Sequence, residues 1–107
     1  MIFYVANSCK RNKENIEKAI KTTHDLQMKD LDNCYICSLL AFSHLEFDDV
    51  SYDAEMEVCF DLISVCDKLI VVGEITKSVR QAIDFAKLIK MEVVRLGEDG
   101  ELQHFTE

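Results

Sequence analysis

The residues best suited to chemistry follow the most apolar run of the chain. Gly73 and Glu74 end the sequence KLIVVGE, and the hydroxyl residues Thr76 and Ser78 come shortly after, at the start of an expected helix. A hydroxyl residue there can cap the helix, and the free N–H groups of a helix N-terminus bind anions. A carboxylate beside such a site can exchange a proton with a substrate. We therefore predict ligand binding at these four residues, with Glu74 as a weak catalytic candidate.

A polar segment, NSCKRNKEN, follows the first apolar run. It places Ser8, Lys10 and Arg11 before a helix, where backbone N–H groups and cationic side chains can hold a phosphate. The segment contains no glycine, so it is neither a dinucleotide-binding fingerprint nor a phosphate-binding P-loop. A solvated loop is the alternative interpretation, and the sequence leaves both open.

His44 follows the second apolar run, at the rim where a ligand is expected. A neutral imidazole there can donate to a phosphate or a base edge, or act as an acid or base, which makes His44 a second weak catalytic candidate. A loop histidine that bonds local backbone is the alternative. His24 and His104 are expected at the surface.

Two other patterns resemble metal or redox sites. Cys34 and Cys37 form a C-x-x-C pattern, but residues three apart in a strand point to opposite faces, so we predict core or strand packing. The acidic residues before and within the second helix match no metal-binding loop, and we interpret them as a solvated face. They are Glu46, Asp48, Asp49, Asp53, Glu55 and Glu57. We predict no metal site and no cofactor.

The elements that position these residues alternate along the chain. Near-continuous apolar runs predict buried strands, and an apolar side chain every three or four residues predicts helices. The expected strands are 2–6, 34–40, 68–73 and 91–96, with a short edge strand after a turn at 98–100. The first helix starts near Asn12 and ends at 28–30, the second runs from Ser51 or Asp53 to near Asp67, and the third starts at Thr76 or Ser78.

This order predicts an α/β fold in a single domain, 1–107. Strands that alternate with helices form a parallel sheet covered on both faces, here a small doubly wound (Rossmann/flavodoxin-like) sheet of four to five strands with three main helices. Ligands of such folds bind at the carboxyl ends of the strands, near the topological switch point. The loops after Ala6, Leu40 and Gly73 are therefore the expected binding region.

Charge and composition exclude several classes of partner. The chain has 12 basic and 20 acidic residues, a formal net charge of -8, and no visible basic face. We therefore expect neither nucleic acid nor an anionic membrane as a partner. No apolar run reaches the length of a transmembrane helix, and the first residues lack the pattern of a signal peptide. The five cysteines lie mostly in apolar runs, as reduced core thiols do, so we expect a cytoplasmic protein.

The order and spacing of several segments resemble the nucleoside 2-deoxyribosyltransferase-like superfamily, in particular short members common in bacterial and phage genomes. The matching segments are YVANS, NIEKA, SHL, CDKLIVVG, ITKS and AIDFAK, and they cover most of the chain. The resemblance implies that Tyr4 and Ser8 of the first strand and loop lie at the ligand. His44, Gly73 and Thr76 also match residues of the family pattern. The pair Cys66-Asp67 matches a Cys-Asp pair before the third strand.

Two departures from the family pattern concern the third helix. Ser78 stands where the family has glycine, and Ala82 where it has glutamate. In the characterised relatives that glutamate is the nucleophile, and an alanine cannot replace it. Asp84 lies about 200° around the helix from position 82, so it cannot take over the role. Without the family, Ala82 is a core alanine on the apolar stripe of Val79 and Ala86.

Three functions remain open at this point. The first is binding of a nucleotide or nucleotide-derived molecule without catalysis, for example as a phage-encoded sponge or sensor of a signalling nucleotide. The second is an active N-glycosidase or deoxyribosyltransferase that uses Glu74 or His44, and the third is a protein-interaction domain. The resemblance also implies a homodimer or higher homo-oligomer, with Met56 and Phe60 of the second helix as candidate contacts.

Overall fold

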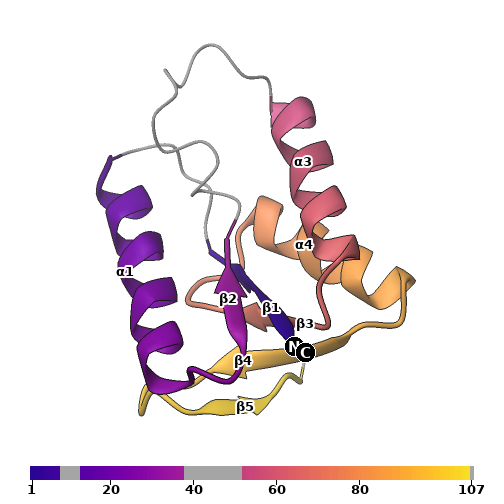
Figure 1. Ribbon diagram of the computed structural model, residues 1–107. Helices are drawn as coiled ribbons and strands as arrows, with labels where there is room; N and C mark the ends of the chain where they lie inside the picture. Colours follow the sequence, from indigo (N-terminus) through magenta and orange to yellow (C-terminus); the bar gives the residue numbers. More distant parts are fainter. Residues whose placement is uncertain (8–12, 38–51, 107) are drawn as a thin grey trace.

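The computed structural model describes residues 1–7, 13–37 and 52–106, and forms one mixed sheet with three helices (Figure 1). The strands are β1 (Ile2–Ala6), β2 (Cys34–Ile36), β3 (Lys68–Val71), β4 (Glu92–Leu96) and β5 (Leu102–His104). The helices are α1 (Lys13–Lys29), α3 (Tyr52–Ser64) and α4 (Lys77–Leu88).

The strand order in the sheet is β2-β1-β3-β4-β5. The first four strands are parallel, and β5 pairs antiparallel with β4 as a short edge strand. The chain places β2 on one side of β1 and then crosses to place β3 on the other side. The topological switch point therefore lies between β1 and β3, and the doubly wound α/β fold predicted from the sequence is confirmed.

Helices cover both faces of this sheet. Alternate side chains of β1 point to opposite faces, as a strand requires. Phe3 and Val5 pack in one cluster with Ile16 of α1, whereas Tyr4 and Ala6 pack in the other, which contains residues of α3 and α4. Figure 1 shows α1 on one side of the sheet and α3 and α4 on the other.

The helices form where the apolar spacing predicts them. Val79, Ala82, Ile83 and Ala86 are the buried apolar residues of α4. Thr76 is the N-cap of α4 and has an extended backbone. The sequence predicts either Thr76 or Ser78 at the start of this helix, and the structure selects Thr76. α3 ends at Ser64, and the turn that follows leads through Asp67 into β3.

Three predicted strands are shorter in the structure, and β4 differs least, because it starts at Glu92 and not at Met91. β2 ends at Ile36, Cys37 lies beyond it, and 38–40 are outside the described residues. β3 ends at Val71 and not at Gly73, because Gly73 has a φ of 71°, which is incompatible with an extended strand. The correction places Gly73 and Glu74 in the loop that leads to α4, and not in the sheet.

The pair Cys66-Asp67 has a structural role at the amino ends of β1 and β3. The Asp67 carboxylate accepts a hydrogen bond of 2.7 Å from the Ile2 backbone N–H, and the Asp67 N–H donates to the Ile2 carbonyl over 2.7 Å. The Cys66 thiol donates to the carbonyl of Leu62 in α3. These bonds join the end of α3 to the start of β1, which sets the register between β1 and β3.

Candidate functional site

A groove lies at the switch point, at the carboxyl ends of β1 and β3. We call it the switch groove, and its volume is about 190 Å³. It is lined by Asn7, Asn15, Lys18, Ala19, Val72, Gly73 and Glu74. Asn7 follows β1 directly, while Asn15 and Lys18 are one turn apart near the start of α1. The polar lining therefore comes from the residue after β1, from the start of α1 and from Glu74 in the loop after β3.

Gly73 gives the switch groove an open floor. A Cβ atom built on Gly73 would meet no atom within 4 Å, so the backbone is open to an approaching group. Its φ of 71° is a conformation that other residues adopt only with strain. The neighbouring Glu74 side chain is exposed at the rim. Two predicted site residues, Gly73 and Glu74, are thus brought together at the predicted edge of the sheet.

Tyr4, Ser78 and Ala82 line a different space, on the face of the sheet that α3 and α4 cover. This inner cavity has a volume of about 10 Å³, which is at the lower limit for one water molecule. Its full lining is Tyr4, Ala6, Asn7, Met56, Cys59, Ser78, Val79 and Ala82. Asn7 also lines the switch groove, and its side-chain amide nitrogen is buried. The predicted site residues therefore form two groups, one on each side of Asn7.

Thr76 and Ser78 belong to the N-terminus of α4. Their hydroxyl oxygens lie 3.2 Å apart, and Ser78 is buried, whereas Thr76 is half-buried and caps the helix without a side-chain hydrogen bond. The first turn of α4, which the structure describes in full, carries no acidic side chain. A helix N-terminus carries a partial positive charge, so this end of the sheet favours a negatively charged group.

Ala82 is 4% exposed and packs in the core cluster of α3 and α4. It lies one helical turn after Ser78, on the wall of the inner cavity. Asp84 is exposed and lies 4.0 Å from Arg80, on the outer face of α4. Neither residue places a carboxylate at the inner cavity.

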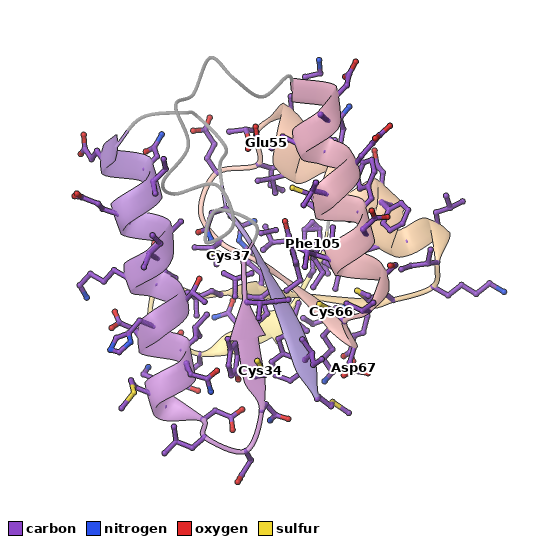
Figure 2. All side chains as sticks on the ribbon, turned by 45° about the horizontal axis from the view of Figure 1, so that its top comes forward. Cys34, Cys37, Glu55, Cys66, Asp67 and Phe105 are labelled. Carbon is purple, nitrogen blue, oxygen red and sulfur yellow. The ribbon has the colours of Figure 1, made fainter. Side chains whose placement is uncertain are left out.

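The sequence did not indicate that Glu55 is buried. It is 4% exposed in the first turn of α3, whereas Asp53 and Glu57 on either side are exposed as predicted. Figure 2 shows Glu55 at the start of α3. The interpretation of the acidic segment as a solvated face is therefore wrong for this residue. The helical spacing from Glu55 to the buried Cys59 is the signal that could have identified it.

The predicted contact residues of α3 are used inside the chain. Met56 is 5% exposed and lines the inner cavity, so the prediction that it contacts another subunit is wrong. Phe60 is half-buried and stacks on Phe85 of α4, with 4.7 Å between the ring centroids. Both side chains pack between α3 and the rest of the fold because they lie on the apolar stripe that buries this helix.

Four predicted ligand residues, Ser8, Lys10, Arg11 and His44, lie outside the described residues. Within the described part of the chain, no group of three His, Cys, Asp or Glu side chains could hold a metal ion. In the same part, no helix has the length and apolar content needed to cross a membrane.

The cysteines in the described part of the chain are separate thiols. Cys34, Cys37, Cys59 and Cys66 are free, and Cys34 is exposed while Cys37 is buried (Figure 2). The predicted packing therefore holds for Cys37, which is buried just beyond the end of β2, and is wrong for Cys34, which is exposed at the start of that strand. Burial, with a smaller contribution from Asp67, raises the pKa of Cys66 to about 11.

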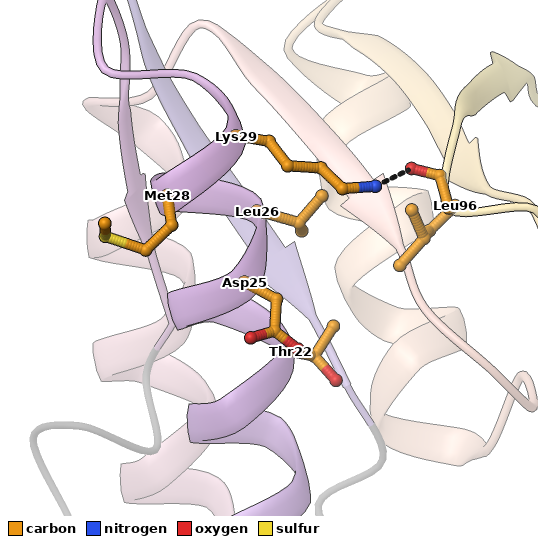
Figure 3. Close-up of a pocket in the computed structure, with 7 residues that line it drawn as sticks. Thr22, Asp25, Leu26, Met28, Lys29 and Leu96 are labelled. Atoms are coloured by element: carbon orange, nitrogen blue, oxygen red, sulfur yellow. Dashed lines mark hydrogen bonds between the residues drawn. The ribbon is translucent and has the colours of Figure 1, made fainter.

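Another groove lies between α1 and the turn from β4 to β5, with a volume of about 430 Å³. Figure 3 shows its lining, which is Thr22, Asp25, Leu26, Met28, Lys29, Leu96 and Gly100. The Lys29 amine donates a long hydrogen bond of 3.5 Å to the Gly100 carbonyl across it. None of the predicted ligand residues that the structure describes lines this groove.

Comparison of the chain with models of protein families, with curated proteins and with solved structures finds no match. The resemblance to deoxyribosyltransferase-like domains therefore stays a prediction from the sequence.

Proposed function

We propose that this protein binds a nucleotide or a nucleotide-derived small molecule at the switch groove, without catalysis. The observation that carries the proposal is the position of the groove. It lies between β1 and β3 at the carboxyl ends of the strands, where doubly wound sheets bind their ligands. The polar side chains of the groove and the open backbone of Gly73 lie together at this edge of the sheet.

The chemistry of the lining suits a nucleoside. Asn15 is half-buried at the groove, and its side-chain amide contains both a donor and an acceptor, as the edge of a base requires. The Glu74 carboxylate can accept hydrogen bonds from sugar hydroxyl groups. Lys18 supplies a positive charge at the same groove. Ligand pockets typically enclose about 300–1,000 Å³, so a groove of about 190 Å³ accommodates one part of a nucleotide.

The absence of catalysis in the proposal rests on Ala82. If the resemblance holds, position 82 should supply the nucleophile, and a buried methyl group lies there. Removing an essential nucleophile lowers the rate by several orders of magnitude. A second candidate function, N-glycoside hydrolysis or transfer, is favoured by one observation. Glu74 lines the switch groove and its side chain is exposed, so its carboxylate is positioned where a general base or nucleophile would be needed.

A thermal-shift screen tests the proposal. The full chain is mixed with nucleosides, nucleoside monophosphates and cyclic nucleotide derivatives, and bound material is analysed for products. A raised Tm with intact ligand supports the binder. Release of free base that Glu74→Gln abolishes supports the second candidate. A lack of any shift contradicts both and favours a protein-interaction domain.

A pair of variants locates the binding. Lys18→Gln removes a charge from the switch groove and should reduce the ligand-induced shift. Lys21→Gln is the matched control, because Lys21 is on the same helix but is paired with Asp25 at 2.8 Å and does not line the groove. Equal shifts for the two variants would place the ligand elsewhere.

The proposal includes two features that the resemblance and the thiols suggest. Free thiols at Cys34, Cys37, Cys59 and Cys66 fit a reducing, cytoplasmic environment. The resemblance implies a homodimer or higher homo-oligomer, and the buried position of Met56 means that its contacts must lie on other side chains. Light scattering coupled to gel filtration measures the assembly directly.

A further inference from the structure

A further groove adjoins the switch groove at the carboxyl ends of β3 and β4. We call it the strand groove, and its volume is about 410 Å³. Its lining is Val72, Gly73, Arg95, Leu96, Gly97, Glu98 and Gln103. Val72 and Gly73 line both grooves, so the two spaces meet over the end of β3.

Gly73 keeps the junction between the grooves open. It has no side chain, and the space where a Cβ atom would lie is empty to 4 Å. A ligand that occupies the switch groove can therefore extend into the strand groove across the Gly73 backbone. The two volumes together fall within the usual range for a site that encloses a small molecule, about 300–1,000 Å³.

Arg95 is the cationic side chain of the strand groove. Strand pairing fixes its backbone between Val71 of β3 and Gln103 of β5. Its Nη2 donates to the Gly73 carbonyl oxygen over 3.3 Å, which holds the guanidinium at the junction. Among the ion pairs of the described residues, none involves Arg95. A guanidinium has five N–H donors in a fork that matches two oxygens of a phosphate.

Glu98 is an acidic side chain in the lining of the same groove. Its side chain is exposed and its charge repels a phosphate. The groove therefore contains one side chain that favours a phosphate and one that disfavours it. Removal of each charge has an opposite expected effect, which makes the site testable with two substitutions.

We propose that the strand groove is the phosphate subsite of the ligand, with Arg95 as the residue that binds it. The inference rests on the proposed function, because the base and sugar would occupy the switch groove. It makes the ligand a phosphorylated nucleoside rather than a free one. Arg95 selects between the two through charge-assisted hydrogen bonds that only the phosphate can accept.

Isothermal titration calorimetry of the full chain tests the phosphate subsite. The ligands are adenosine, guanosine, cytidine and uridine, and their 5′-monophosphates. We expect the monophosphate of the preferred base to bind at least about tenfold more tightly than its nucleoside. Arg95→Gln should remove most of that difference, measured as the ratio of the nucleoside and monophosphate affinities within the variant. Glu98→Gln should increase the difference, and Lys21→Gln, which removes a cation from a distant part of α1, should not change it.

The outcomes separate the two proposals. Equal affinity for nucleoside and monophosphate, or a difference that persists in Arg95→Gln, overturns the phosphate subsite and leaves the proposed function intact. Binding of inorganic phosphate alone, with no preference for a nucleotide, also overturns it. If no nucleoside and no nucleotide binds, both proposals fail. An unchanged Tm for Arg95→Gln without ligand confirms that the variant is folded.

Discussion

Ser78 and Ala82 lie one helical turn apart on α4, and both line the inner cavity that Tyr4 of β1 closes from the sheet side. The position that the resemblance assigns to a nucleophile is therefore a small residue in a packed core. The cavity of about 10 Å³ leaves no room for a longer side chain without movement of α3 or α4.

The first prediction concerns this packing. Ala82→Glu forces a carboxylate into the core and should lower the free energy of unfolding by about 3 kcal/mol or more. Leu88→Glu introduces the same side chain on the same helix at a position that is 77% exposed, and should change stability by less than about 1 kcal/mol. Urea denaturation measures both. A stable Ala82→Glu variant that hydrolyses nucleosides would instead reveal a site that had lost only its nucleophile.

A second prediction concerns the start of β1. Asp67→Asn weakens the charge-assisted bond to the Ile2 N–H and should cost about 1 kcal/mol, since the bond is exposed to solvent. Asp61→Asn, on the exposed side of α3, is the control and should have little effect. Because Asp67 lies at the amino end of the parallel strands, ligand binding should be unchanged. A loss of binding without a loss of stability would contradict the structural role.

The third prediction concerns pH. Hydrogen bonds, first from Asn33 and then from Tyr35, lower the pKa of Asp30. A folded-state pKa below the unfolded value stabilises the protein above the unfolded pKa, near 3.9, and this contribution is lost as the pH falls through the folded pKa. Tyr35→Phe removes one donor and should raise the pKa of Asp30, as carboxyl NMR titration measures.

Asp25 provides the internal control for that titration. A hydrogen bond from Lys21 is the main cause that lowers its pKa, and Tyr35 has no part in it. The Asp25 titration should therefore be the same in Tyr35→Phe and in the unmodified protein. If both carboxyl groups shift together, the substitution has changed the helix and not a single hydrogen bond.

A fourth prediction concerns the thiols. With a pKa of about 11, only about one Cys66 thiol in a thousand is ionised at pH 8, and the side chain is also buried. Cys34 is exposed. Iodoacetamide should label Cys34 well before Cys66 in the folded protein, as peptide mass mapping shows. Equal rates for the two peptides would mean that the end of α3 opens readily.

Much of the fold follows from the sequence because the apolar runs are long and distinct. The bounds of β1 agree at both ends, and α4 begins at one of its two predicted caps. β3 was predicted two residues too long because Val72 continues the apolar run, while the turn depends on the backbone conformation of Gly73. Apolar content alone does not show where a strand leaves the sheet.

The candidate site was predicted less completely. A groove lies at the edge of the sheet where the sequence predicts a ligand, but the sequence did not show that Tyr4 and Glu74 lie on different sides of Asn7. That division depends on which face each side chain takes at a strand end. Nor did the acidic type of Glu55 indicate burial, because the packing of α3 against the sheet determines it.

The most direct test of the central claim is an NMR titration of the ¹⁵N-labelled full chain with each of the four nucleoside 5′-monophosphates. We predict that the largest changes in amide signals occur at Asn7, Gly73, Glu74 and Arg95, around the two adjoining grooves. Changes confined to the groove between α1 and the β4–β5 turn, or no changes with any nucleotide, would contradict nucleotide binding at the switch point.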